Sequence, residues 1–200
     1  MTEIICAKNI YWRSDNNAAN EVLKDVSVEL ASNEFVVLRG ASGSGKSKLL
    51  KVLSGTLAPS SGELSYRGFK VNGLSAAKFK EIRGSIGYIA EDPVFIKGKS
   101  LYENIEYVLK LKNTPAKLIF DKILHMLKLT GMASKRDLLP CDLSQSEKKK
   151  FSLAMVFSSE VECVLCDFNL VNHEYDRELF MLLKGATYRG MGVLVTAKDA

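Results

Sequence analysis

The chain has 200 residues, a length that suits one domain or one domain with a small additional lobe. It is 46% apolar and 26% charged, as in an ordinary soluble globular protein, and no apolar run reaches the roughly 18 residues of a membrane span. The net charge of +5 is mild, so most lysines and arginines are assigned to a solvated surface and no nucleic-acid partner is expected. The N-terminal Met-Thr-Glu is not a basic region followed by an apolar one, which predicts a cytosolic protein without a signal peptide.

The first third of the chain predicts strands. Residues 3–10 and 26–30 have strand-like apolar patterns and flank a polar, Asn-rich turn at 15–20. Residues 35–39 are a short apolar, β-branched run, which is typical of a buried parallel strand. Glycines separate short strand-like pieces in 62–73, which indicates a hairpin.

Helices dominate the middle of the chain. A short helix is predicted at 75–83, followed by a strand at 86–90. Ser100 and Glu103 form the sequence of a capping box, which predicts a helix that continues to about residue 112.

The second half continues this pattern and then returns to alternating strands and helices. Thr114-Pro115 begins a helix that Gly131 ends. A second capping box at 144–147 begins another helix. Three elements are expected after it: a strand at 161–167, a helix near 174–184 and a strand at 193–197.

The strand at 35–39 leads into the pattern G-x-x-x-x-G-K-[ST], a phosphate-binding loop. Its residues are Gly40, Ala41, Ser42, Gly43, Ser44, Gly45, Lys46 and Ser47. The glycines allow backbone N–H groups to turn inward around phosphate oxygens, and the start of the following helix adds partial positive charge. We expect Lys46 to reach the β- and γ-phosphates, Ser47 to bind Mg²⁺ and the backbone N–H of Lys48 to contribute.

A second candidate magnesium ligand is Asp167, which ends an apolar strand. An acid at the end of a strand beside the loop strand can hold Mg²⁺ or its water, although an aspartate can also simply end a strand. The order of elements predicts an α/β P-loop NTPase core in a single domain of residues 1–200. We expect a mainly parallel sheet with flanking helices, an N-terminal antiparallel region and an α-helical subdomain inserted at about 96–158.

The cysteines do not predict a metal centre. Cys163 and Cys166 have C-x-x-C spacing, but residues three apart on a strand point to opposite faces. Cys6 and Cys141 are distant in sequence. All four are interpreted as small buried apolar residues.

These features together resemble the ATP-binding subunit of an ABC transporter, most of all the compact FtsE, LolD and MacB group. The resemblance extends over about residues 3–199. It is carried by residues 21–27, 40–53, 59–62, 86–88, 92–93, 101–105, 143–144, 167, 193–195 and 199. It implies a dimer, with ATP and Mg²⁺ held between the phosphate loop of one subunit and the signature motif of the other. It also implies an integral membrane permease-like partner and a cytoplasmic, peripheral position on the inner face of the cell membrane.

Several positions depart from the family pattern. The strand that ends in Asp167 should continue with a glutamate base, but residue 168 is phenylalanine. Lys198 replaces the histidine near the γ-phosphate, and Glu91 replaces a glutamine. Since Phe168 has no proton acceptor, the resemblance implies a weakened or lost general base.

The signature motif, expected as L-S-G-G-Q or L-S-G-G-E, also departs. Here it is the sequence Leu143, Ser144, Gln145, Ser146 and Glu147. Both glycines have been replaced by residues whose side chains should hinder approach to a partner's phosphate. By alignment the adenine-stacking aromatic falls near Ser14, with Tyr11 or Trp12 as substitutes.

We therefore expect a subunit that binds Mg·ATP but hydrolyses it poorly, acting as a switch or scaffold for a membrane partner. Neither a homodimer nor a heterodimer would contain a complete site built from these positions. A working ABC ATPase that uses another base and a scaffold that no longer needs ATP stay open as alternatives. The apolar loop at 93–96 is interpreted in two ways, as a docking surface for the membrane partner or as packing beneath the helical lobe.

Overall fold

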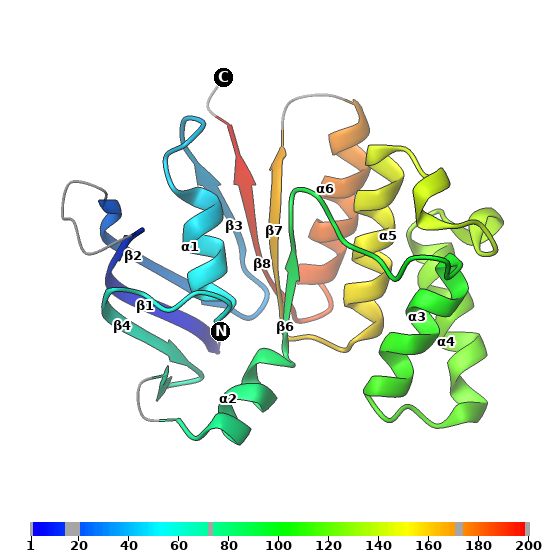
Figure 1. The fold of residues 1–200 in the computed structure, drawn as a ribbon, viewed down its shortest axis with the longest axis horizontal. Coiled ribbons are helices and arrows are strands. Elements are labelled where there is room, and N and C mark those ends of the chain that lie inside the picture. The colour runs from blue at the N-terminus through cyan, green and yellow to red at the C-terminus, as the bar shows by residue number, and fades with distance from the viewer. Residues whose placement is uncertain (1, 15–20, 72–73, 171–173, 199–200) are drawn as a thin grey trace.

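The computed structural model describes residues 2–14, 21–71, 74–170 and 174–198. Its elements form two sheets, with helices around the second (Figure 1). The first sheet is antiparallel, with strand order β2-β1-β4-β5. Its strands are β1 (Glu3–Arg13), β2 (Glu21–Ala31), β4 (Ser61–Tyr66) and β5 (Phe69–Lys70).

The second sheet is parallel, with strand order β3-β8-β7-β6. Its strands are β3 (Phe35–Arg39), β6 (Ile86–Ile89), β7 (Cys163–Leu170) and β8 (Gly192–Ala197). All four strands therefore end at one edge of the sheet, which is the upper edge in Figure 1. The carboxyl edge of an open parallel sheet is where ligands usually bind.

The helices fall into two groups. The first helix after β3 packs against the sheets, whereas two later helices stand apart from them with a third between (Figure 1). The bounds are α1 (Lys46–Leu53), α2 (Ala76–Arg83), α3 (Leu101–Leu111), α4 (Ala116–Leu129), α5 (Gln145–Ser158) and α6 (Glu174–Thr187). Helix α5 lies between the sheets and the two outer helices: it contacts α3 and α4 on one side and β6 on the other. No helix in the described part of the chain is both long and apolar enough to cross a membrane.

The core has three apolar clusters. One lies beneath the antiparallel sheet and includes Leu49 and Leu53 of α1. A second joins β7 and β8 to α5 and α6, and a third joins α3, α4 and α5. Leu101, Ile105 and Leu109 of α3 are fully buried in the third cluster, as their spacing of four residues requires.

Most predicted elements are confirmed, together with the predicted fold class. The capping boxes at Ser100 and Ser144 are both present, and Ser75 caps the short helix α2. The predicted turn at 15–20 lies outside the described residues.

Two expectations about β7 were wrong. The strand predicted at 161–167 continues to Leu170, because Phe168 is itself apolar and packs in the core. Asp167 was expected on a strand beside the loop strand, but β8 lies between β3 and β7. The crossover through α6 returns the chain to the middle of the sheet, so β8 separates the two.

Candidate nucleotide-binding site

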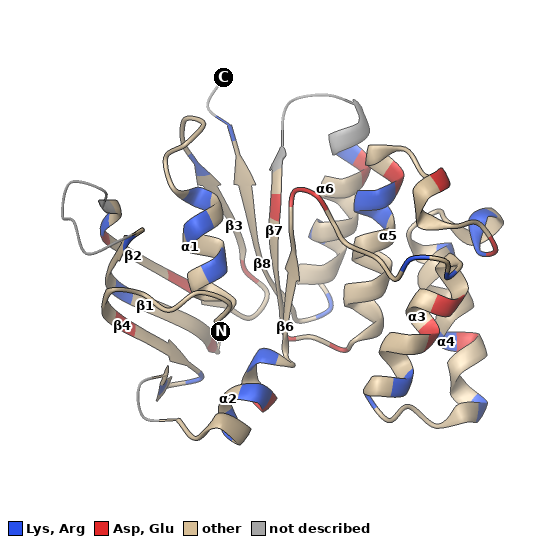
Figure 2. Ribbon diagram, in the orientation of Figure 1, with Lys and Arg blue, Asp and Glu red and all other residues tan. Residues whose placement is uncertain are grey.

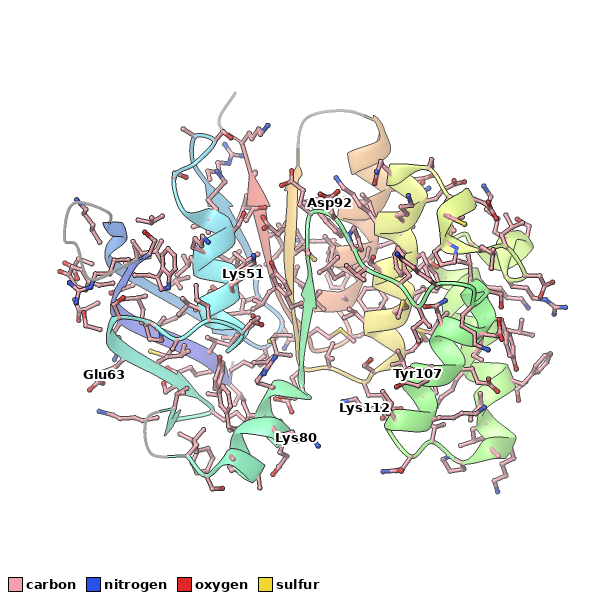
Figure 3. All side chains as sticks on the ribbon, viewed as in Figure 1. Lys51, Glu63, Lys80, Asp92, Tyr107 and Lys112 are labelled. Atoms are coloured by element: carbon pink, nitrogen blue, oxygen red, sulfur yellow. The ribbon has the colours of Figure 1, made fainter. Side chains whose placement is uncertain are left out.

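Every sequence-predicted position of the core site follows or ends one of the parallel strands. The phosphate loop follows β3, Glu91 follows β6 and Lys198 follows β8, while Asp167 lies near the end of β7. The structure thus brings these positions to one edge. Asp92, next to Glu91, also lies there (Figure 3).

Gly45 fits the loop tightly against the antiparallel sheet. Its φ of +91° is in the left-handed region, which glycine adopts without strain. A Cβ at this position would lie 2.8 Å from Leu23 Cδ2 and 3.2 Å from the Val22 carbonyl oxygen. The loop therefore needs a glycine here on two independent grounds, backbone conformation and space.

Lys46 lies inside the loop rather than in solvent. Only 8% of the residue is exposed. Its Nζ donates to the Gly40 and Ala41 carbonyl oxygens at 2.5 and 2.8 Å, and to Ser44 Oγ at 3.4 Å. The loop thus holds the ammonium over its own turn, where phosphate oxygens can replace the carbonyls as hydrogen-bond acceptors.

The start of α1 carries partial positive charge. Among the described residues, no side chain caps the N-terminus of α1 after Gly45, and no acid lies in its first turn. The first N–H groups of a helix have no partner within the helix, so they are available to an anion. Figure 2 shows basic segments along α1, where Lys46, Lys48 and Lys51 lie.

Asp167 is a buried carboxylate. It is 3% exposed, and its Oδ1 accepts a hydrogen bond of 3.1 Å from Thr196 Oγ1 on β8. Tyr88 of β6 lies nearby: burial raises the pKa of Tyr88 to about 12, and the Asp167 charge adds to that rise. Tyr88 therefore remains a neutral phenol at physiological pH.

Phe168 occupies the place of the expected glutamate but points elsewhere. The residue is 1% exposed, and its ring packs in the cluster shared by β7, β8, α5 and α6. Lys149 of α5 donates to the Phe168 carbonyl oxygen at 3.2 Å, and its ammonium lies 5.4 Å from the ring centroid. Residue 168 is thus a core position of this fold, tied to the start of α5.

The signature-motif residues 143–147 form a capped N-terminus of α5. Leu143 is buried beneath the helices. Ser144 Oγ accepts from the Glu147 backbone N–H, and Glu147 Oε2 accepts from the Ser144 N–H at 2.9 Å and from its hydroxyl at 2.8 Å. Glu147 also pairs with Lys135. Foremost the Lys135 hydrogen bond, and then those from Ser144, lower the pKa of Glu147 to about 2.

The two glycine replacements behave differently. Gln145 is exposed, whereas Ser146 is half-buried. The Ser146 hydroxyl oxygen is buried, and none of the described residues forms a hydrogen bond with it. The remaining degenerate positions, Glu91 and Lys198, are both exposed.

Sequence reasoning missed one contact beside the loop. The Lys48 ammonium lies over the Trp12 ring, 4.7 Å from its centroid. Trp12 is half-buried against the cluster beneath the antiparallel sheet. A lysine and a tryptophan 36 positions apart give no local sequence signal. Pairing of β1 with β2, and packing of the loop on β2, bring them together.

The loop that follows β6 was interpreted either as a docking surface or as packing beneath the helical lobe, and its residues differ in this respect. Val94 is 92% exposed, while the Phe95 ring packs 5.1 Å from that of Phe151. Asn104, which is fully buried, fixes the next turn: its Oδ1 accepts from the Ile96 N–H at 2.9 Å, and its Nδ2 donates to the Ser100 carbonyl at 2.9 Å. Phe95 is therefore packing, and Val94 is surface.

The cysteines are distributed largely as expected. Cys163 and Cys166 are buried in different clusters on opposite faces of β7, which confirms that they cannot share a ligand. Cys141 is exposed, which contradicts its interpretation as a buried residue: it lies in the short 3₁₀ turn Pro140–Asp142.

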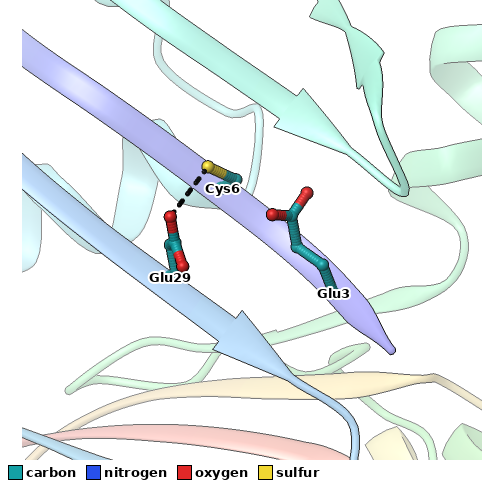
Figure 4. Close-up of side chains that lie close together, drawn as sticks. All are labelled: Glu3, Cys6 and Glu29. Carbon is teal, nitrogen blue, oxygen red and sulfur yellow. Dashed lines mark hydrogen bonds between the residues drawn. The ribbon is translucent and has the colours of Figure 1, made fainter. Parts of the chain in front are cut away.

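Cys6 lies near two carboxylates, those of Glu3 and Glu29 (Figure 4). Burial, the Glu3 charge and the hydrogen bond to Glu29 raise the thiol pKa, and Sγ lies 3.5 Å from Glu29 Oε1. Both carboxylates are exposed. A thiol held protonated in this way is a poor metal ligand.

The residues fit a nucleotide with a magnesium ion. The loop supplies a glycine-dependent turn, an uncapped helix start and a lysine, and these are what phosphate needs. Ser47 and Asp167 supply a hydroxyl and a carboxylate, which are ligands that Mg²⁺ prefers.

Comparison with known proteins identifies the family. The ABC transporter family matches residues 23–168, and the chain belongs to it. It is 30% identical to HrtA of Staphylococcus haemolyticus, named for hemin import, over 91% of this chain and 84% of HrtA. It is 29% identical to the cell division ATP-binding protein FtsE of Mycobacterium tuberculosis, over 92% and 80%. It spans about half of the methionine import protein MetN of Vibrio vulnificus, at 28% identity.

Solved structures agree on the fold. CbiO1 of Clostridium perfringens, part of the CbiONQ transporter complex, matches the whole chain and 80% of its own with a TM-score of 0.86 and 22% identity. The dimeric ABC transporter cassette MJ0796 matches 98% of this chain and 88% of its own, with a TM-score of 0.84 and 24% identity. The chain therefore has the fold of an ABC ATP-binding subunit.

Proposed function

We propose that this protein is an ATP-binding subunit of an ABC-type membrane complex that binds Mg·ATP and hydrolyses it poorly or not at all. Residues 40–48 would hold the phosphates, with Ser47 and Asp167 on Mg²⁺. The observation that carries the proposal is a contrast at one sheet edge. Lys46 lies inside an intact loop, while the Phe168 side chain is buried in the core.

The weak hydrolysis follows from the chemistry of three positions. Phe168 has no proton acceptor, and general-base assistance is typically worth about 10²–10⁴-fold in rate. Lys198 would contribute an ammonium, which holds phosphate as a point charge and donates hydrogen bonds but has no acceptor atom for a proton. Glu91 would bring a carboxylate in place of an amide. Together these residues favour a bound triphosphate over a cleaved one.

The protein would act through a partner, as a nucleotide-dependent switch or scaffold. The three relatives are named for different processes but share the description of an ATP-binding protein, and we extend only that to this chain. We infer an integral membrane permease-like subunit, an ABC-type homo- or heterodimer and a peripheral position on the cytoplasmic face of the membrane. Val94 is the candidate contact, since its side chain is almost wholly exposed beside the helices α3 and α5.

Thermal unfolding tests nucleotide binding. A ligand at 100 times its dissociation constant adds about 2.7 kcal/mol, which raises the melting temperature by several degrees for a chain of this size. We expect Mg·ATP to produce that rise in the wild type and in Lys51→Ala but not in Lys46→Ala. Lys51 is a matched control because it is a lysine five residues further along the same helix. A wild type that does not respond to millimolar Mg·ATP contradicts the proposal.

Phosphate release tests the second half of the proposal. We expect the wild type with Mg·ATP to release phosphate no faster than Lys46→Ala. Release well above that control would identify a working ATPase with another base. For the partner, Val94→Asp should reduce the fraction of the protein that sediments with membranes from its own cells. Met181→Asp, which alters another exposed apolar residue, 62% accessible and on α6, should not.

A further inference from the structure

The pairing of Lys48 with Trp12 places a cation over an aromatic ring beside the phosphate loop. The ammonium lies 4.7 Å from the ring centroid. Trp12 packs against the core beneath the antiparallel sheet and is half-buried, so the cation covers part of the surface that the core leaves open. A flat base that stacks on this exposed surface must displace the ammonium.

The backbone explains why the two side chains meet. Gly45, the residue before α1, packs against Leu23 of β2 closely enough to exclude a Cβ. Leu23 is the cross-strand partner of Trp12 on β1. The loop, Leu23 and Trp12 are therefore adjacent. Lys48, in the first turn of α1, reaches the indole from the loop side.

Lys48 has no other strong partner among the described residues. The nearby cation Lys46 is held by two loop carbonyls, whereas the contact of Lys48 is with an aromatic ring. No described carboxylate forms an ion pair with Lys48. An exposed cation–π contact is weaker than a charge-assisted hydrogen bond to phosphate, so phosphate in the loop competes successfully for this ammonium.

We propose that Lys48 is a two-position cation that couples recognition of the phosphates to recognition of the base. In one position it covers Trp12, as the structure has it. In the other it binds a phosphate oxygen of the nucleotide and uncovers the indole for the base. This inference rests on the proposed nucleotide site. It adds a role for the Lys48 side chain, which the phosphate-loop pattern does not specify.

If Lys48 has these two positions, removing its charge should affect the binding of phosphate and the binding of the base in opposite directions. A ligand with phosphates and no base draws Lys48 from the ring. A ligand with a base and no phosphate competes with Lys48 for the ring. Replacing Lys48 with methionine, which keeps the length of the side chain and removes its charge, should therefore weaken the first ligand. The same replacement should leave the second unchanged or strengthen it.

Trp12 reports this change directly, because it is the only tryptophan in the chain. The probe is magnesium pyrophosphate, which cannot stack on an indole. We expect pyrophosphate to change the Trp12 fluorescence of the wild type and of Lys51→Met, and to leave that of Lys48→Met unchanged. Calorimetry should show that Lys48→Met still binds pyrophosphate, with a dissociation constant raised about tenfold. Lys48→Arg should restore the fluorescence response.

Adenosine provides the second arm of the experiment. Its dissociation constant for Lys48→Met should equal or fall below that for the wild type, which a merely structural role for Lys48 would not produce. The inference is overturned if Lys48→Met gives the full fluorescence response to pyrophosphate, or if the wild type binds pyrophosphate by calorimetry with no change at Trp12. A wild type that binds neither pyrophosphate nor Mg·ATP overturns the proposed function itself, and this inference with it.

Discussion

Two helices of this protein begin near the same edge, and their first turns are built in opposite ways. Helix α1 has Gly45 at its N-cap, which provides no side-chain cap. Among the described residues, no acid lies in the first turn of this helix. The start of α5 has a complete capping box, with Ser144 and Glu147 satisfying each other and Lys135 paired with the same glutamate. The first turn is open to an anion, whereas the second is closed by its own carboxylate.

This difference separates a turn suited to phosphate from a turn that departs from the family pattern. In the loop, a side chain at Gly45 would collide with Leu23. At α5, side chains at the former glycine positions are accommodated, and Lys149 ties this helix to the carbonyl of Phe168. The end of β7 and the start of α5 thus form one packed unit, and changes there should act on stability more than on nucleotide binding.

The largest effect is expected at Phe168. Phe168→Glu, which restores the family's residue type, places a carboxylate where a ring is 1% exposed. We expect a loss of about 4 kcal/mol or more in the free energy of unfolding, from the lost packing and the buried charge. Urea denaturation measures it. Phe168→Leu, the control that keeps the site apolar, should lose about 1.5 kcal/mol or less. A Phe168→Glu protein as stable as the wild type that gains phosphate release would place residue 168 in the site instead.

The next largest loss of stability is expected in the phosphate loop, at the uncapped start of α1. Gly45→Ala introduces both strain at a φ of +91° and a contact of 2.8 Å with Leu23. Gly43→Ala introduces strain alone, since nothing lies within 4 Å of the added Cβ at its φ of +82°. We expect Gly43→Ala to lose about 1 kcal/mol and Gly45→Ala about 2 kcal/mol more. Equal losses in urea denaturation would show that the loop does not press against β2.

The sequence predicted the loop, both capping boxes and most element boundaries because each depends on residues close together in the chain. It failed where the fold decides. Asp167 was expected on the neighbour of β3, but strand order depends on how α6 returns the chain, and no local pattern encodes that. The strand at 161–167 was expected to end at Asp167, although the apolar character of Phe168 was the available signal that it continues into the core.

A smaller effect is expected at Glu147, where stability should depend on pH. The pKa of this carboxyl falls from its ordinary value of 4.5 to about 2 in the folded protein. Its stabilising contribution is therefore fully present above pH 4.5 and is lost as the pH falls toward 2. Glu147→Gln should lose about 1 kcal/mol at pH 7, with that difference narrowing below pH 4.5. Chemical denaturation at several pH values measures it, with Glu106→Gln, which removes the ion pair with Lys110 on α3, as the control. A difference that stays constant down to pH 2 contradicts this account.

The smallest effect has the opposite sign. Ser146 and Ser152 lie on the same helix, but the Ser152 hydroxyl donates to the Lys148 carbonyl oxygen at 2.8 Å, while no described group bonds that of Ser146. Removing a buried hydroxyl without a partner relieves a desolvation cost, whereas removing a bonded one also loses its hydrogen bond. Relative to Ser152→Ala, Ser146→Ala should therefore be more stable by about 1 kcal/mol, and it should equal or exceed the wild type in urea denaturation. A loss of stability in Ser146→Ala would mean that its hydroxyl has a partner, and that the start of α5 is satisfied throughout. A gain would locate a desolvation cost at Ser146, the half-buried one of the two positions where the family motif has glycine. Such a cost is expected if this surface serves contact with another subunit rather than stability.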